Sequence, residues 1–115
     1  MRYALLIQDN PAIYPTLTPS ELEQISKEYL AIRDVPGVVD GGQLQGPETA
    51  TTVRVQDGDA LLTDGPFADT KEVFAGYYIV EADNIDVALQ VAARIPAARL
   101  GGAVEVRPLV EKPGM

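Results

Sequence analysis

The sequence predicts an α+β fold in a single domain, and three observations support this prediction. Short apolar runs of strand length alternate with two segments in which apolar residues recur every three or four positions, as in amphipathic helices. Asp57-Gly58 separates two further runs, and this pair favours the tight turn of a β-hairpin. The chain has 115 residues and is 46% hydrophobic, which suits one globular domain over residues 1–109 with a frayed tail over residues 110–115.

The first strand and helix are predicted from the apolar pattern and from capping residues. Residues 3–8 form a strand that is apolar on both faces, and residues 9–16, which include two prolines, form a loop. Thr18 caps the helix that follows, because Glu21 stands where a capping box requires it. The helix should end near Asp34, since a proline lies shortly beyond it.

Two adjacent glycines interrupt the next predicted strand, residues 38–44. Glycine weakens a strand, so Gly41-Gly42 indicates either a β-bulge or the close approach of another group, such as a ligand, to the backbone. The sequence favours the bulge.

Residues 51–56 and 59–63 form the predicted hairpin, because Asp-Gly suits a type I′ turn in which both residues have positive φ. The resulting register places four apolar residues on one face, namely Val53, Val55, Ala60 and Leu62. We expect this face to lie in the core, and the opposite face to meet water or a wet cleft. Asp64 then falls on the core side, at its rim.

The C-terminal part is predicted as strand, helix, strand. Residues 74–81 form a second strand that is apolar on both faces, and residues 103–107 form the last one. Asp83 caps the helix between them and Pro96 stops it. The buried stripe of this helix is expected to comprise Ile85, Ala88, Leu89, Ala92 and Ile95.

Without the hairpin, the order of elements is βαββαβ, which is the ferredoxin-like plan. Such a sheet carries both helices on one face. Two of its strands, residues 3–7 and 74–80, are nevertheless apolar on both faces, and an uncovered face would expose a large apolar patch. We therefore expect a second copy to cover it, giving a homodimer.

Charge and composition exclude several classes of partner. The net charge is −8 and the nine Lys and Arg residues are scattered, which argues against nucleic acid and against anionic membrane surfaces. No apolar run approaches the length of a membrane span, and the N-terminus does not resemble a signal peptide, so a cytoplasmic location is expected.

The sequence contains neither His nor Cys. The commonest general base and the usual ligands of zinc, copper and haem are therefore missing. We expect no metal site and no cofactor.

Several ordered motifs resemble one family. They are Thr63-Asp64-Gly65-Pro66-Phe67, Thr70-Lys71-Glu72, Gly76-Tyr77-Tyr78, Ala97-Ala98-Arg99 and Val104-Glu105-Val106-Arg107-Pro108, with Gly41-Gly42 and Thr51-Thr52-Val53-Arg54. Over nearly the whole chain the sequence resembles the DGPF-domain branch of the YCII-related proteins. The resemblance implies a dimeric α+β barrel built from ferredoxin-like protomers.

The resemblance implies no settled activity. Some YCII-type relatives have a His–Asp site, at least one dechlorinates an aromatic ring, and other DGPF members occur with alternative sigma factors. Because this chain has no His, the His–Asp pair cannot be carried over to it.

The Asp-Gly-Pro-Phe segment has a structural interpretation, a functional one, and a third in which it contacts a second copy or another partner. In the first, Asp64 accepts backbone N–H bonds, Gly65 and Pro66 fix a turn, and Phe67 plugs the edge of the core. The sequence favours this interpretation, because such residues commonly punctuate turns.

In the functional interpretation, Asp64 lies at the rim of an apolar cleft near Lys71 and Glu72. A desolvated carboxylate beside a Lys acts as a general base or holds a polar group of a substrate. Asp64 is thus the candidate catalytic residue, and the candidate ligand-binding residues are Asp64, Gly65, Pro66, Phe67, Lys71, Glu72, Tyr78, Arg54 and Arg107.

The tyrosine and arginine candidates also have two interpretations each. Tyr77 and Tyr78 point to opposite faces of one strand, so one packs under the helices and the other faces the dimer cleft. Arg54 and Arg107 either clamp a ligand carboxylate or form ion pairs with the abundant acids. Packing and ion pairing are favoured in each case.

Three functions remain open, in this order of preference. The first is a homodimer that binds a small organic ligand in a cleft between the sheet and the dimer interface. The second is a cofactor-free enzyme of the lyase, isomerase or dechlorinase type, acting on a small aromatic or dicarbonyl substrate with Asp64 as base and Lys71, Tyr78 or Arg107 as electrophilic stabiliser. The third is a regulatory partner of a sigma factor, and this rests on the family resemblance only.

Overall fold

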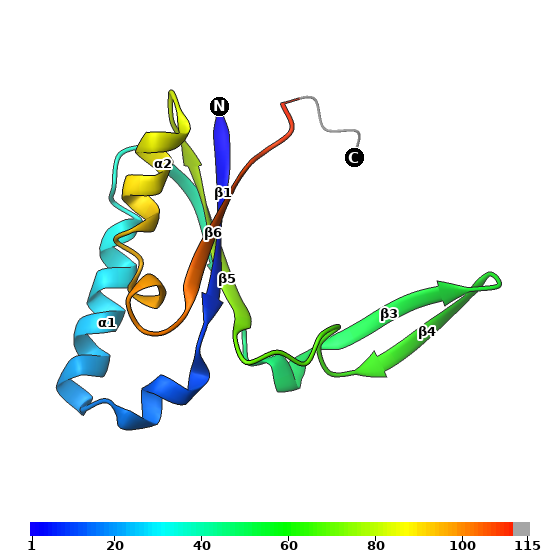
Figure 1. Ribbon diagram of the computed structural model, residues 1–115. Helices are drawn as coiled ribbons and strands as arrows, with labels where there is room; N and C mark the ends of the chain where they lie inside the picture. The colour runs from blue at the N-terminus through cyan, green and yellow to red at the C-terminus, as the bar shows by residue number, and fades with distance from the viewer. Residues whose placement is uncertain (112–115) are drawn as a thin grey trace.

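The computed structural model describes residues 1–111 and has an α+β fold with two antiparallel sheets, as the sequence predicts (Figure 1). Its strands and α-helices within this part of the chain are β1 (Arg2–Asp9), α1 (Pro19–Ile32), β2 (Val38–Gln43), β3 (Thr51–Gln56), β4 (Asp59–Asp64), β5 (Val73–Glu81), α2 (Ile85–Ala92) and β6 (Ala103–Pro108). Short 3-10 helices occupy Pro11–Thr16, Pro47–Thr49 and Pro96–Ala98. The end of the predicted tail, residues 112–115, lies outside the described residues.

Four strands form the main sheet in the order β2-β5-β1-β6, and every neighbouring pair is antiparallel. Both α1 and α2 lie on one side of this sheet (Figure 1). The order of elements and the two helices on one face are consistent with the predicted ferredoxin-like plan.

The core lies between the helices and one face of the sheet. Tyr3, Leu5 and Ile7 alternate along β1 toward this face and are buried, as are Tyr78 and Val80 on β5. The helices and the segment after α2 close the core with Ile32, Ala88, Val91, Ala92, Ile95 and Ala97.

The other face of the sheet carries no helix. Leu6, Tyr77 and Ile79 point toward this side, because each is adjacent along its strand to residues that point into the core. Phe74, paired with Gln8 beyond a β-bulge in β5, is 47% exposed. We call this surface the open face, and the sequence predicts its apolar character.

The predicted cap of α1 is confirmed. Thr18 Oγ1 accepts a hydrogen bond from the Glu21 N–H at 3.1 Å, and Glu21 Oε1 accepts one from the Thr18 N–H at 3.1 Å. The helix ends at Ile32, slightly before the predicted boundary at Asp34.

The predicted start and stripe of α2 need correction. Its cap is Asn84 and not Asp83, because Asn84 Oδ1 accepts from the Val87 N–H at 3.3 Å. The helix is also shorter than expected and presents Ala88, Val91 and Ala92 to the core. Ile85 and Leu89 of the predicted stripe are exposed, because the sheet lies beneath a neighbouring stripe of the helix.

The glycine pair in β2 leaves room for two aromatic rings. A Cβ on Gly41 would lie 2.8 Å from Cδ1 of Tyr78, and one on Gly42 would lie 3.2 Å from Cε1 of Tyr77. The predicted bulge at this pair is not present, because Gly41 and Gly42 pair in regular register with Tyr78 and Tyr77, and the register shift between β2 and β5 lies earlier, between Val38 and Asp40. Close approach therefore explains both glycines, because the ring of Tyr78 lies against Gly41 and the ring of Tyr77 lies against Gly42.

Strands β3 and β4 form a hairpin arm, residues 51–64, that projects away from the main sheet on the side opposite the helices (Figure 1). The predicted register is confirmed, with Val53 opposite Leu62, and both turn residues have positive φ, 52° at Asp57 and 81° at Gly58.

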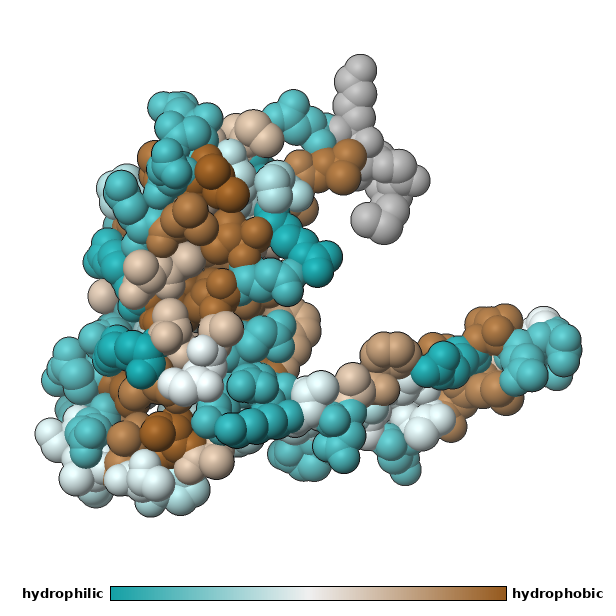
Figure 2. Space-filling view, viewed as in Figure 1, coloured by the Kyte–Doolittle hydropathy of each residue, from teal (hydrophilic) through white to brown (hydrophobic). Residues whose placement is uncertain are grey.

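The predicted burial of one hairpin face is wrong for the single chain. Val53, Val55 and Leu62 are exposed, by 59%, 72% and 70%, and hydrophobic side chains run along the arm (Figure 2). Asp64 is exposed at the end of β4, so it does not lie at the rim of the core. A hairpin register fixes which residues share a face, but not what that face packs against.

No helix among residues 1–111 has the length and apolar character needed to cross a membrane.

Candidate functional site

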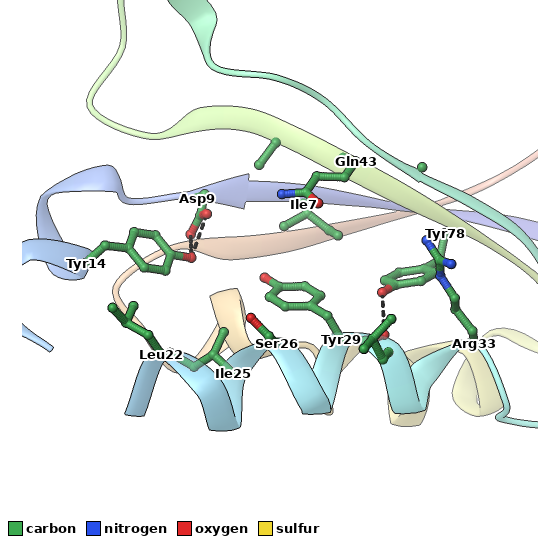
Figure 3. Close-up of a pocket in the computed structure, with 14 residues that line it drawn as sticks. Ile7, Asp9, Tyr14, Leu22, Ile25, Ser26, Tyr29, Arg33, Gln43 and Tyr78 are labelled. Carbon is green, nitrogen blue, oxygen red and sulfur yellow. Dashed lines mark hydrogen bonds between the residues drawn. The ribbon is translucent and has the colours of Figure 1, made fainter. Parts of the chain in front are cut away.

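A cavity of about 610 Å³ lies between α1 and the main sheet. Its walls come from β1, α1, β2 and β5, together with Tyr14 of the 3-10 helix that follows β1. This volume is within the range of small-molecule sites. Polar side chains reach it at both ends, and Ile7 and Ile25 contribute apolar wall between them (Figure 3).

One end of the cavity holds a carboxylate–phenol pair. The Tyr14 hydroxyl lies 2.7 Å from each carboxylate oxygen of Asp9. Asp9 points to the helix side because it follows Tyr3, Leu5 and Ile7 in the alternation of β1, at the strand's last position. Burial, and then the hydrogen bond to Asp9 and its negative charge, raise the pKa of the Tyr14 phenol far above its usual value.

Tyr29 lies between the two ends (Figure 3). Burial and the negative charge of Asp9 raise the pKa of Tyr29 to about 12. Both phenols therefore remain protonated donors at neutral pH, beside a carboxylate that accepts.

The other end of the cavity holds Tyr78 and Arg33. The Tyr78 hydroxyl donates to the backbone carbonyl of Tyr29 at 2.9 Å, and Arg33 caps the C-terminus of α1 beside it (Figure 3). Burial raises the pKa of Tyr78, and the positive charge of Arg33 acts in the opposite direction. Tyr78 is thus the tyrosine that packs under the helices, and Tyr77 is the one that points to the open face.

The Asp-Gly-Pro-Phe segment lies at the junction of the arm, away from the residues that line this cavity. The Gly65 N–H donates to the Ala50 carbonyl at 2.8 Å, and Thr52 Oγ1 donates to the Gly65 carbonyl at 2.8 Å. Gly65 has φ of 101°, a value that glycine adopts readily. These contacts form a turn, but no hydrogen bond among residues 1–111 reaches the carboxylate of Asp64, so the backbone N–H bonds expected for Asp64 are not present.

The expected plug at Phe67 is not present in the single chain. Phe67 is 75% exposed, and the guanidinium of Arg54 lies 5.0 Å from the centre of its ring. This distance is that of a cation–π contact, so Arg54 packs on the loop.

The other candidates do not converge with Asp64. Lys71 is exposed, Glu72 is half-buried, and no hydrogen bond or ion pair among residues 1–111 joins either of them to Asp64. Arg107 lies on β6 and pairs with Glu105, as the ion-pair interpretation expects. Of the candidate residues named from the sequence, Tyr78 alone lines the cavity.

Sequence analysis missed the polar residues that do line the cavity. Asp9 and Tyr14 fall in a segment predicted only as a loop, and the sequence predicts no role for Arg33 near the expected end of the first helix. The available signal was the alternation of β1, which continues one step further and places a carboxylate on the core side of the sheet.

No group of three or more acidic side chains within the described residues is arranged to hold a metal ion. The polar side chains that line the cavity supply one carboxylate, three phenols, one guanidinium, the hydroxyl of Ser26 and the amide of Gln43.

Comparison with known proteins now places the chain. The family model described as the YCII-related domain matches residues 1–112. The chain belongs to the YCII-related family. A relative in Rhizobium meliloti (strain 1021), 32% identical and aligned over 99% of this chain and 97% of its own length, is described as an uncharacterized protein.

A solved structure is also similar to this YCII-related chain. It is 5-chloro-2-hydroxyhydroquinone dehydrochlorinase from Burkholderia phenoliruptrix AC1100, in complex with 2,5-dihydroxybenzoquinone. The two are 18% identical, with a TM-score of 0.49, and the match covers 97% of this chain and 96% of the other.

Proposed function

We propose that the protein binds a small organic ligand in the cavity between α1 and the main sheet. The observation that carries this proposal is the cavity of about 610 Å³, which joins an apolar wall to a few polar groups at its ends. Binding sites for small molecules combine these two features, since burial of apolar surface supplies affinity and the polar groups fix orientation.

A screen by thermal shift tests the proposal. Aromatic acids, catechols and oxo-acids are the panel, because the cavity offers aromatic walls, hydrogen-bond acceptors and one cation. A binder present at about 100 times its Kd stabilises the fold by about 2.7 kcal/mol, a shift of several degrees in Tm.

A cavity-filling variant separates binding in the cavity from binding elsewhere. Ser26→Phe adds a ring to the lining of the cavity, and Lys27→Phe adds the same ring at the adjacent, exposed position of α1. Every ligand-induced shift should vanish in Ser26→Phe and persist in Lys27→Phe. Equal shifts in both variants would reject the cavity as the site.

We further propose that the protein is a homodimer of the dimeric α+β barrel type, with a ferredoxin-like protomer of the DGPF branch. The support is the open face with Leu6, Phe74 and Tyr77, together with the exposed apolar rows of the arm. Both lie on the side of the sheet away from the helices (Figure 1), where a second copy would bury them. The ligand cleft that the sequence placed at this interface stays a prediction, separate from the cavity under α1.

A cofactor-free enzyme is a second candidate, and the Asp9–Tyr14 pair is the observation that favours it. A carboxylate and a protonated phenol within hydrogen-bond distance supply a base and a proton donor in one cavity. Asp64, the base named from the sequence, is exposed at the end of β4 and does not line this cavity. If a ligand from the screen is turned over, Asp9→Asn should abolish turnover and Asp64→Asn should leave it unchanged.

Association with a sigma factor and a cytoplasmic location stay predictions from the sequence.

A further inference from the structure

The two ends of the cavity under α1 carry opposite charge. Asp9 lies at one end and Arg33 at the other, with Tyr29 between them (Figure 3). Arg33 lies beside Tyr78, whose partner on β1 is Leu5. At about 3.3 Å per residue, Leu5 and Asp9 are about 13 Å apart along β1, and side chains shorten the free span between the ends.

The carboxylate of Asp9 has room for another hydrogen bond. The Tyr14 hydroxyl lies 2.7 Å from both oxygens but has a single proton, so it occupies one of about four acceptor positions. No ion pair within the described part of the chain involves Asp9. This end of the cavity therefore receives a hydrogen-bond donor and repels an anion.

At the other end of the cavity, Arg33 favours an anionic group of the ligand. It is exposed at the mouth of the cavity and takes part in none of the ion pairs of residues 1–111. The Tyr78 hydroxyl beside it is already committed to the Tyr29 carbonyl, at 2.9 Å. The planar guanidinium is thus the group that meets a ligand here, and its donors match a carboxylate in bidentate fashion.

The middle of the cavity suits a flat apolar body. Ile7 lines it on the strand side and Ile25 on the helix side. Gly42 and Gly76 also line it, and because glycine has no side chain they present only backbone there. A Cβ on Gly76 would lie 2.6 Å from the Gly42 carbonyl oxygen, so the two strands meet without side chains between them.

We propose that the cavity selects a single-ring aromatic acid with a ring hydroxyl at the end opposite the carboxylate. The hydroxyl donates to Asp9, the ring lies between Ile7 and Ile25, and the carboxylate pairs with Arg33. This selectivity rests on the proposed ligand-binding function and names the ligand class. The raised pKa values of Tyr14 and Tyr29 agree with it, because both phenols stay protonated at neutral pH and add no negative charge to the cavity.

Three probes test the proposal by isothermal titration calorimetry with the full chain at neutral pH. They are 4-hydroxyphenylacetate, phenylacetate, which lacks the hydroxyl, and tyramine, which replaces the carboxylate by an ammonium group. We expect 4-hydroxyphenylacetate to bind about 10- to 150-fold more tightly than phenylacetate, the value of one hydrogen bond to a charged group. Tyramine should bind at least tenfold more weakly than 4-hydroxyphenylacetate.

Two variants test which end of the cavity binds the hydroxyl of the ligand and which binds its carboxylate. Asp9→Ala should bring the affinity for 4-hydroxyphenylacetate down to that for phenylacetate, and leave phenylacetate unchanged. Arg33→Gln should weaken both acids about equally, by tenfold or more, whereas the matched surface change Arg94→Gln should weaken neither. Arg94 is exposed and does not line the cavity.

Equal affinity for the two acids, preferred binding of tyramine, or unchanged affinity in Arg33→Gln would each overturn the ligand class. If none of the three probes binds while another compound gives a shift that Ser26→Phe removes, the class is wrong and the cavity function stands. If the whole panel gives no shift, both fall.

Discussion

At the scale of single residues, the Asp9–Tyr14 contact is the feature that distinguishes the cavity from ordinary core packing. A carboxylate seldom faces the inner side of a sheet unless a partner satisfies it. Here the partner is a phenol from the segment directly after the strand, so β1 and the turn that follows it build this end of the site together.

Replacement of Tyr14 by Phe should destabilise the protein by about 1–2 kcal/mol, since hydrogen bonds to charged groups contribute about that much where solvent partly reaches them. Urea denaturation measures the change. Tyr3→Phe is the control, because its hydroxyl meets only the sulfur of Met1, a weak acceptor, at 3.8 Å. Equal losses in the two variants would show that the Asp9 contact contributes nothing of its own.

The phenol of Tyr29 should make the free energy of unfolding depend on pH in the alkaline range. Its pKa is raised to about 12 by burial and by Asp9, so the folded state keeps this proton where the unfolded chain loses it. The contribution is fully present below about pH 10, the ordinary tyrosine value, and is lost as pH rises through about 12. Urea midpoints should therefore fall less steeply above pH 10 in Tyr29→Phe than in the wild type. Parallel curves would refute the assignment.

At the scale of elements, the two helices show how local rules succeed and fail. The capping box of α1 is fixed by two residues three positions apart, Thr18 and Glu21, and is correct to the residue. For α2 the sequence offers Asp83 and Asn84 side by side, both good caps, and local preference does not choose between them. The stripe of α2 is displaced for a related reason, because the face a short helix buries depends on where the sheet lies.

The cap of α2 gives a direct test. Asn84→Ala removes the side-chain acceptor of the Val87 N–H and should cost about 1 kcal/mol of stability. Asp83→Ala, one residue earlier, should cost only a few tenths of that. Denaturant unfolding of the two variants decides, and a larger loss in Asp83→Ala would restore the cap predicted from the sequence.

At the scale of the whole molecule, the arm and the open face leave apolar surface without a partner in the single chain. The arm makes its hydrogen bonds within itself and extends from the sheet, which is unusual for a hairpin with exposed valines and leucines. Burial by a second copy accounts for both features at once.

Sedimentation tests this assembly. The wild type should sediment at twice the chain mass at micromolar concentration, whereas Phe74→Asp on the open face and Leu62→Asp on the arm should shift it toward single chains. Val87→Asp, at a similarly exposed position of α2, is the control and should leave the mass unchanged. A folded wild-type protein that sediments as a single chain would reject the dimer, but not the cavity, which one chain forms alone.

The sequence by itself determined the strands, both helices, the register of the hairpin and the two-sided apolar character of β1 and β5. These features depend on neighbouring residues and on periods of 2 and 3.6, which a linear pattern records. For the glycine pair in β2 the sequence favoured a bulge over a close approach, whereas in the structure the rings of Tyr78 and Tyr77 on the adjacent strand lie against Gly41 and Gly42.

Only the tertiary structure decided where the site lies. Asp9 and Arg33 are far apart in the sequence and meet one cavity because α1 crosses back over β1 and β5. It likewise decided that the hairpin, whose apolar face looked internal, stands free of the chain's own core. The physical reason is the same in both cases: a pattern of apolar residues specifies which side of an element seeks burial, whereas the packing of distant elements specifies what it meets.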